Sequence, residues 1–547
     1  MRLAAVVTLS FLTIAAHGQQ TLHVPAQYAT IQAAVNAAVT GDTVLVAPGT
    51  YSGVVPICTG ITIEGSGGAE VTTIVGGMTC NSSSTQALVR GFTITGGSPG
   101  IYIERSSPRF ENCIVTGNAG FDGGGVQCRS TSTTYVTSPE FVNCLIVGNY
   151  ATARGGGASF LRTDNYPHPE PRFENCTIEG NFGLDFGGGI YAQNALITLE
   201  DCRVLSNSAQ GSGGGIFGSS YVVRRCVFRG NQALLSANPQ DSDGGAVSGD
   251  VSIWDSQFSG NSAHRFGGAI ASSGFIIERC TVAENVASLA GGVFVNTGGN
   301  PISLRNSIVY GNVGGDVMAG APIAVIGPSF IGVGGPFTAA SLSQFSTADP
   351  GFVDPANGDF HLSQNSPCRD AGDPNATNLP VADFDGTPRV VGAAIDIGCD
   401  EVPAQQFPGT GEDLDIYVKV NEQGDPLASS ATAAAGDLVH VLVRTPGGSF
   451  AGTTFLLAAE VGPTGYQSYF DPFFPSVHLY PTQAFVLAGS TNAGPFAAPG
   501  FPPNGLDLYY QIPPGLGGYT IRLQGFAITA FSANGIFACS NARDVNL

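Results

Sequence analysis

Short runs of alternating apolar and polar residues recur along most of the chain, and glycine pairs separate them. Typical runs begin at Cys176 (Cys-Thr-Ile-Glu) and at Cys226 (Cys-Val-Phe-Arg). Such alternation predicts short β-strands with one buried face, because successive side chains of a strand point to opposite sides. Each run follows an aromatic or aliphatic residue and leads to Gly-Asn and then to a Gly-Gly turn. The runs are therefore parts of a repeat built from strands and tight turns.

The repeat varies in length but keeps one asparagine at an equivalent place in every copy. The column consists of Asn118, Asn149, Asn181, Asn207, Asn231, Asn261, Asn285 and Asn312. Neighbouring members lie 24 to 32 residues apart. Solenoids of helix pairs need roughly 33–47 residues per repeat. We therefore interpret each copy as one coil of a parallel β-helix, with successive coils about 4.8 Å apart.

A second column lies five residues before each asparagine. Its members are Cys113, Cys144, Cys176, Cys202, Cys226, Ser256, Cys280 and Ser307. Stacked asparagines can link donor to acceptor along the axis and so satisfy buried polar groups. Cysteine and serine are small enough to fill the interior. We expect a structural Asn ladder and a packed Cys column, whose spacing also allows a few vertical disulfides. A metal site is not expected, since no Cys-x-x-Cys spacing occurs.

The N-terminal stretches differ from the repeat. Residues 1–18 combine a positive start, an apolar run and a small-residue cleavage pattern, which predicts a secretory signal peptide. A short amphipathic helix is predicted after it, because Ile31, Ala34, Val35 and Ala38 share one face. This helix is expected to cover the first coil of the solenoid.

The predicted β-helix spans residues 19–348, and two further segments follow it. Residues 349–404 are expected to close the β-helix, and the alternating strands of residues 405–547 predict a small β-sandwich. Cys368 and Cys399 lie about one coil apart and suit a disulfide in an oxidising compartment. The predicted class is therefore all-β: a right-handed parallel β-helix solenoid with an N-terminal capping helix and a C-terminal β-sandwich.

Several motifs resemble known β-helix proteins. The segments 24–35 and 41–51 resemble the entry of secreted bacterial right-handed parallel β-helices, the pectate-lyase-like superfamily in its broad sense. The copies around Asn231 and Asn261 resemble polymorphic outer-membrane-protein repeats, and 349–401 is similar to the closing segment of β-helices with varied C-terminal anchors. The likeness implies the fold over about residues 22–401. It does not fix an activity, because this fold hosts lyases, hydrolases, epimerases and adhesins.

Composition narrows the function classes. The formal net charge is −20, which argues against nucleic-acid partners, since these need a basic surface. Lys419 is the only lysine, so lysine is absent from almost every catalytic scheme. After the signal peptide, no apolar run is long enough to predict a transmembrane helix. We expect a secreted or cell-surface protein.

One constellation stands out beside the Gly-Gly turns. Asp122 and Arg154 directly precede glycine runs in successive copies, and Asp185 lies one residue further back in the next. Stacked in register, these three side chains predict an anion-binding or sugar-binding groove with Arg154 as its cation. The alternative interpretation is a solvated ion pair that holds a corner, worth at most about 1 kcal/mol. Any catalytic role would fall to these three residues.

Two weaker candidates lie in longer insertions. Tyr135 and Tyr166 belong to two long loops and are suited to stack on sugar rings. Asp241 and Asp243 resemble a calcium turn, although two carboxylates are too few for the roughly six to eight oxygens that calcium takes. No recognisable lyase or glycosidase set accompanies them.

The sequence thus favours a non-catalytic scaffold that binds glycans or other surfaces along a loop-bearing face. One alternative is a polysaccharide lyase of the pectate-lyase type that acts on an acidic polysaccharide with calcium. The other is a purely structural envelope component. No cofactor is expected apart from the calcium of the first alternative.

Overall fold

The computed structural model describes residues 19–402 with short gaps, and separate strands after residue 414. The gaps are residues 58–59, 82–85, 132–135, 163–166, 236–241, 296–301, 320–323, 326–327, 333–344, 364 and 385–386. After residue 402 the described ranges are 415–420, 430–434, 437–444, 454–463, 485–489, 496–497, 506–511, 519–528 and 537–546. The chain divides into two compact units, residues 1–221 and 222–547.

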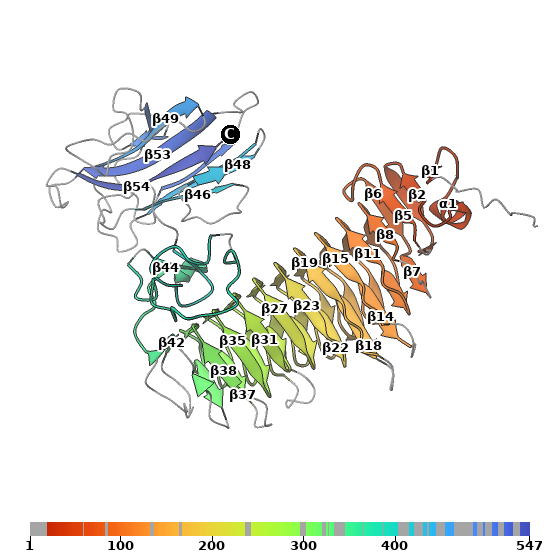
Figure 1. Cartoon of the computed structure of the whole chain (residues 1–547), viewed down its shortest axis with the longest axis horizontal. Coiled ribbons are helices and arrows are strands. Elements are labelled where there is room, and N and C mark those ends of the chain that lie inside the picture. The colour runs from red at the N-terminus through yellow and green to blue at the C-terminus, as the bar shows by residue number, and fades with distance from the viewer. Residues whose placement is uncertain are drawn as a thin grey trace, which may run out of the picture. The chain divides into compact units, whose positions relative to one another are not determined.

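In the first unit, parallel strands stack coil upon coil into four sheets, named A to D (Figure 1). Sheet A contains β1 (Thr21–Val24), β2 (Thr43–Val46), β5 (Thr62–Gly65), β8 (Leu88–Arg90), β11 (Arg109–Glu111), β15 (Glu140–Val142), β19 (Arg172–Glu174) and β23 (Ile197–Glu200). Sheet B contains β3 (Gly49–Ser52), β6 (Thr72–Val75), β9 (Thr93–Thr95), β12 (Ile114–Thr116), β16 (Leu145–Val147), β20 (Thr177–Glu179) and β24 (Arg203–Leu205).

Sheet C completes the coils, and from β13 onwards a sheet D strand precedes it. Sheet D contains β13 (Ala119–Asp122), β17 (Tyr150–Arg154), β21 (Phe182–Gly183) and β25 (Ser208–Ala209). Sheet C contains β4 (Val55–Pro56), β7 (Met78–Asn81), β10 (Ile101–Glu104), β14 (Val126–Ser130), β18 (Ala158–Arg162), β22 (Ile190–Gln193) and β26 (Ile216–Gly218). A full coil therefore runs from A through B and D to C. The predicted right-handed parallel β-helix is confirmed.

Helix α1 (Ile31–Ala37) lies against β1, β2 and β4 at the start of the coils. The Thr30 hydroxyl accepts a hydrogen bond from the Ala33 N–H at 3.1 Å, which caps the first turn. Ile31, Ala34 and Val35 are buried, as the amphipathic pattern predicts. The predicted capping helix is thus present.

Turn chemistry fixes the corners of each coil. Between sheets A and B, the left-handed conformation is taken by Asn112, Asn143, Asn175 and Asp201, whose short polar side chains tolerate positive φ. Between sheets D and C, the glycine run is required by close contact. A Cβ on Gly156 would lie 2.4 Å from the carbonyl carbon of Phe182 on the next coil. Any larger residue there would push the coils apart.

The asparagine column forms a buried hydrogen-bonded ladder in both units. In the first unit, each Nδ2 donates to the Oδ1 of the next member, at 2.9 to 3.0 Å, through Asn118, Asn149, Asn181 and Asn207. In the second unit, the bonds run from Asn231 through Asn261 and Asn285 to Asn312 at 2.8 to 2.9 Å. Asp316 ends that ladder by accepting from Asn312 at 2.7 Å.

The interior between the sheets is apolar. Phe110, Phe141 and Phe173 stack on consecutive coils with ring centroids 5.3 and 4.9 Å apart. The Cys column lies beside them. Its members Cys113, Cys144, Cys176 and Cys202 are at most 2% exposed. The repeating residue types of the sequence are therefore interior positions that meet their own kind on the next coil.

The second unit continues with the same strand types. Sheet A strands are β27 (Tyr221–Arg224), β31 (Val251–Trp254), β35 (Phe275–Glu278), β38 (Ile302–Arg305) and β41 (Ala324–Val325). Sheet B strands are β28 (Val227–Arg229), β32 (Gln257–Ser259), β36 (Thr281–Ala283), β39 (Ile308–Tyr310), β42 (Ser329–Ile331) and β43 (Phe345–Ser346). Sheet D strands are β29 (Gln232–Ala233) and β33 (Ser262–Ala263), and sheet C strands are β30 (Val247–Ser248), β34 (Ile270–Ser272), β37 (Val293–Val295) and β40 (Val317–Ala319).

A closing segment covers the last coils of this unit. It contains the hairpin β44 (Phe352–Asp354) and β45 (Asp359–Leu362), joined by the 3-10 turn η3 (Pro355–Asn357). Leu362, Cys368 and Ile397 pack against Ile308 and Phe330 of the coils. Cys368 and Cys399 are buried thiols here, and no disulfide joins them.

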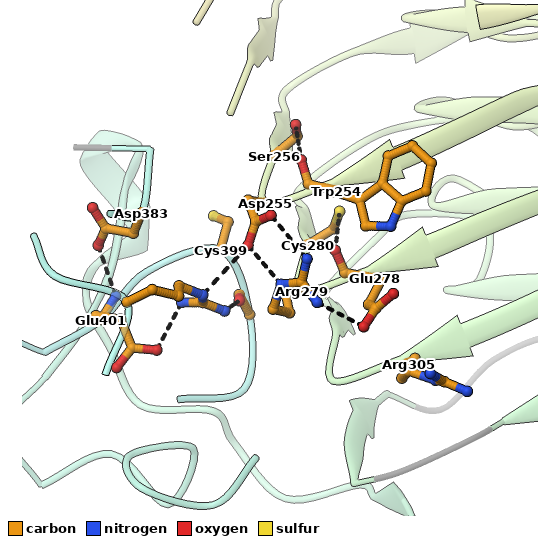
Figure 2. Close-up of polar contacts among 12 residues, drawn as sticks. Trp254, Asp255, Ser256, Glu278, Arg279, Cys280, Arg305, Asp383, Cys399 and Glu401 are labelled. Carbon is orange, nitrogen blue, oxygen red and sulfur yellow. Dashed lines mark hydrogen bonds and ion pairs between the residues drawn. The ribbon is translucent and has the colours of Figure 1, made fainter. Parts of the chain in front are cut away.

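A buried charge network joins the closing segment to the coils (Figure 2). Asp255 contacts two arginines: Arg279 Nε at 2.7 Å from the next coil, and Arg389 Nε at 3.3 Å from the closing segment. Glu278 and Glu401 lie 2.6 and 2.8 Å from the outer nitrogens of these arginines. Arg279 and Arg389 are 2% and 1% exposed, so both charges depend on these partners.

The C-terminal strands form two mainly antiparallel sheets. One contains β46 (Asp415–Val420), β48 (Leu438–Arg444) and β52 (Leu506–Gln511). The other contains β47 (Ser430–Thr432), β54 (Phe537–Asn546), β53 (Tyr519–Ile528), β49 (Thr454–Pro463), β50 (Phe485–Gly489) and β51 (Phe496–Ala497). Strand β46 lies against β47 and β54, as expected for a sandwich. The predicted boundaries at residues 348 and 404 stay predictions.

Candidate functional site

The residues singled out beside the glycine turns meet at the corner between sheets D and C. Asp122 ends β13 and pairs in register with Arg154 at the end of β17, after a bulge between Gly120 and Asp122. Arg154 Nε and Nη2 donate to the two Asp122 carboxylate oxygens at 2.9 and 3.2 Å. The Asp122 side chain is 2% exposed and that of Arg154 is 28% exposed. The contact is a bidentate ion pair with a buried carboxylate.

Arg154 is also held by an aromatic side chain of sheet C. Its Nη1 donates to the Tyr191 hydroxyl at 3.1 Å, and its guanidinium carbon lies 4.8 Å from the centre of that ring. Tyr191 stacks on Phe217 with centroids 5.6 Å apart. Although burial alone would lower the pKa of Arg154, the hydrogen bonds to Asp122 and Tyr191 raise it above its ordinary value. Arg154 is therefore a fixed cation.

Asp185 does not join this corner. Its side chain is exposed, and Phe186 occupies the position before the glycine run, where its carbonyl accepts from the Gly155 N–H at 3.0 Å. Phe186 stacks on Phe217 with centroids 4.7 Å apart. The structure thus joins Arg154 to Asp122 and to aromatic rings, and the three-charge stack that the sequence predicts contains two of its members.

The remaining predicted residues lie elsewhere. Tyr135, Tyr166 and Asp241 are outside the described residues. Asp243 forms an ion pair with Arg265, whose Nε lies 2.7 Å from Asp243 Oδ1. Among the described side chains, no group of three or more metal-binding residues is arranged to hold a metal ion. The carboxylate of Asp243 therefore faces a guanidinium in this structure.

The sequence reasoning missed an aromatic surface on the outside of sheet D. Tyr150 is 41% exposed and Phe182 half-buried; they pair in register, and their rings stack with centroids 5.6 Å apart and planes 6° apart. Phe121, on the preceding coil, is 69% exposed. We define the sheet D face as the outward side chains of Phe121, Tyr150, Thr152, Phe182 and Leu184.

A sequence signal for this surface does exist. Each ladder asparagine points inward, so the residue directly after it begins the sheet D strand and points outward. Tyr150 follows Asn149, and Phe182 follows Asn181. On the same strand as Tyr150, Thr152 is exposed and Arg154 half-buried. The aromatic face and the Arg154 corner are therefore parts of one continuous outer surface.

One comparison with known proteins supports the fold. A family model described as a right handed beta helix region matches residues 167–330. No curated protein matches the sequence. A solved PL6 family alginate lyase is similar over 66% of this chain and 60% of its own length, less than two thirds of it, at 14% identity and a TM-score of 0.30. No helix among the described residues is long and apolar enough to cross a membrane. The chain contains a right-handed parallel β-helix.

Proposed function

We propose that the protein is a secreted or cell-surface β-helix scaffold that binds glycans without cleaving them, through the sheet D face. The observation that carries the proposal is the exposed, stacked Tyr150–Phe182 pair. Large exposed aromatic groups in a cluster are typical of interaction sites. The apolar C–H face of a pyranose ring fits such a surface, while its hydroxyls seek polar groups at the edge.

The geometry leaves room for a sugar beside Tyr150. Phe182 covers one face of the Tyr150 ring, and the residue in register on the other side is Ala119, whose methyl group covers little. Arg154 lies on the same strand, four residues further on. Three of its N–H groups bond to Asp122 and Tyr191, and a guanidinium has five N–H donors. The others are suited to bond sugar hydroxyls.

Arg154 supports binding rather than catalysis. A lyase base must be deprotonated before it can accept the substrate's proton, whereas Asp122 and Tyr191 hold Arg154 in its charged form. Its partner Asp122 is buried and faces the guanidinium, so that carboxylate is not presented to a substrate. The net charge of −20 repels polyuronates. We therefore expect neutral glycans to bind best.

The remaining part of the proposal is the location of the protein outside the cytoplasm. The signal-peptide pattern of residues 1–18, which lie outside the described residues, supports a secreted or surface location. There the scaffold would meet polysaccharides rather than nucleic acids.

A glycan array tests the proposal directly. The full chain after residue 18 is applied to neutral and uronate glycans beside a Tyr150→Ala/Phe182→Ala variant. We expect the wild type to bind neutral glycans and the double variant to lose this binding. A Tyr28→Ala control, which changes a half-buried tyrosine before α1, should keep it. Equal binding by the wild type and the double variant, both folded by circular dichroism, would remove the sheet D face as the site.

A further inference from the structure

The Cys column of the first unit places four thiols at equivalent positions on four consecutive coils. The N–H groups that follow Cys144, Cys176 and Cys202 donate to the carbonyls of Cys113, Cys144 and Cys176 at 2.8 to 2.9 Å. The backbones are therefore one strand spacing apart, about 4.8 Å. A disulfide requires Cα atoms about 4.4 to 6.8 Å apart, so each neighbouring pair meets the distance requirement.

The four cysteines are buried thiols in the structure. Cys144 Sγ donates to the carbonyls of Val142 at 3.3 Å and Phe110 at 3.5 Å, and the Cys144 N–H donates to Cys176 Sγ at 3.4 Å. Cys176 Sγ therefore lies beside the backbone of Cys144. A disulfide needs the two side chains to turn towards each other until their Cβ atoms are about 3.5 to 4.5 Å apart.

We propose that this thiol column is a modification site: during folding with a small disulfide oxidant, Cys113 bonds to Cys144 and Cys176 bonds to Cys202. Cys113 is the end member of the column, so pairs counted from this end are Cys113–Cys144 and Cys176–Cys202, and the next member, Cys226, stays a thiol. The position equivalent to Cys113 on the preceding coil is Phe92, so the column begins at Cys113. The two bonds would staple four coils into two covalent pairs.

The chemistry balances with oxidised glutathione as the oxidant. One cysteine thiolate attacks a glutathione sulfur and forms a mixed disulfide, which releases one glutathione thiolate. The neighbouring cysteine thiolate attacks the protein sulfur of that mixed disulfide and releases the second. The two thiol protons pass to the released glutathiones.

The folded state excludes the oxidant, so the reaction belongs to folding. The four cysteines are 1%, 2%, 0% and 1% exposed. Once formed, the disulfides are equally buried and resist reduction. Serine occupies the same column at Ser256 and Ser307, where each hydroxyl accepts the N–H of the preceding member, Cys226 or Cys280. Cysteine-to-serine variants in the column are therefore expected to fold.

The chain supplies two internal controls. Cys280 has Ser256 and Ser307 on its neighbouring coils, so the column offers it no thiol partner. Burial raises the pKa of Cys280 to about 12, which keeps it inert. Cys80 and Cys128 share one column of sheet C, but Ile103 lies between them. Neither control should enter a disulfide.

The test refolds the reduced full chain after residue 18 in a mixture of reduced and oxidised glutathione. Remaining thiols are then alkylated. Cleavage at glutamate, aspartate and arginine places Cys113, Cys128, Cys144, Cys176, Cys202 and Cys226 on different peptides, because Asp122, Glu140, Glu174, Glu200 and Arg203 lie between them. We expect linked peptides Cys113–Cys144 and Cys176–Cys202, each lighter by two hydrogens than its two thiol peptides together.

Two variants sharpen the result. Cys144→Ser should leave Cys113 alkylated while the Cys176–Cys202 link persists, and Cys280→Ser should leave both links unchanged. Recovery of all four column cysteines as alkylated thiols from folded wild-type protein would overturn the proposal. So would the shifted links Cys144–Cys176 or Cys202–Cys226, and links that join cysteines of non-neighbouring coils, such as Cys80 to Cys128.

Discussion

Replacing Arg389 by methionine should loosen the closing segment from the coils. Methionine keeps much of the length and the apolar stem of arginine but removes every donor. The change deletes the contacts of Arg389 with Asp255 and Glu401, and the hydrogen bond from its Nη2 to the Gly398 carbonyl at 2.7 Å. Asp255 keeps Arg279, whereas Glu401 loses the arginine that faces it.

The expected loss follows from burial. Arg389 and Glu401 are each 1% exposed, and removing one partner of a buried ion pair costs about 3–5 kcal/mol because the other stays desolvated. Because burial keeps Glu401 protonated below about pH 8, the pair is fully charged only above that pH, and at neutral pH the cost lies at the lower end. A loss of 3–5 kcal/mol raises the rate of hydrogen exchange through local opening roughly 100- to 5,000-fold.

Hydrogen exchange followed by mass spectrometry measures this loss locally. Solenoid coils contact mainly their neighbours, so faster exchange should be confined to the closing segment and the coils it covers. The control is Arg172→Met, which removes an arginine that is 49% exposed from its pairs with Glu174 and Glu200, and should cost below about 1 kcal/mol. Equal effects of the two variants, or no change around Glu401, would refute the reasoning.

Three further predictions concern the ladder, the closing segment and the Arg154 corner. Asn261→Ala should lower the free energy of unfolding in urea by about 3 kcal/mol or more. Asn231, Asn285 and the Phe228 carbonyl each lose a buried partner, worth about 1–3 kcal/mol. The control Asn36→Ala changes an exposed asparagine and should cost little, and similar losses in the two variants would contradict the role of the ladder. Burial raises the pKa of Glu401 to about 8 from 4.5, so the folded state holds a proton that the unfolded chain releases. Its stabilising contribution is full below about pH 4.5 and is lost as the pH rises through 8. Glu401→Gln should flatten the dependence of the unfolding free energy on pH, and an unchanged slope of that free energy against pH would contradict the prediction. Arg154→Ala should weaken glycan binding about 3- to 10-fold in calorimetry through the lost donors, and unaltered affinity would remove Arg154 from the site.

The repeating parts of this protein could be predicted from the sequence because their contacts are periodic. A residue such as Asn149 meets Asn118 and Asn181, its own equivalents on adjacent coils, so one column of identical letters specifies a contact. The same logic predicts the buried Cys column and the glycine corners. Local signals sufficed for the capping helix, where Thr30 precedes an apolar stripe.

The candidate site was harder to predict because register slips where strands bulge. The order of residues suggests that Asp185 stacks on Arg154. The Leu184 and Asp185 N–H groups instead donate to Ala151 and Ala153, and the position beside the glycine corner falls to Phe186. The buried charge network between the closing segment and the coils is harder still to predict. Arg389 and Asp255 are 134 positions apart, and no periodicity links them.

The most direct test of binding without cleavage is the mass spectrum of a neutral oligosaccharide, chosen from the array, recovered from immobilised protein. The sheet D face predicts that the wild type retains the glycan and returns it with unchanged mass, and that the Tyr150→Ala/Phe182→Ala variant retains none. Recovery of shortened products, lost again in Arg154→Ala, would contradict the account and identify the Arg154 corner as catalytic.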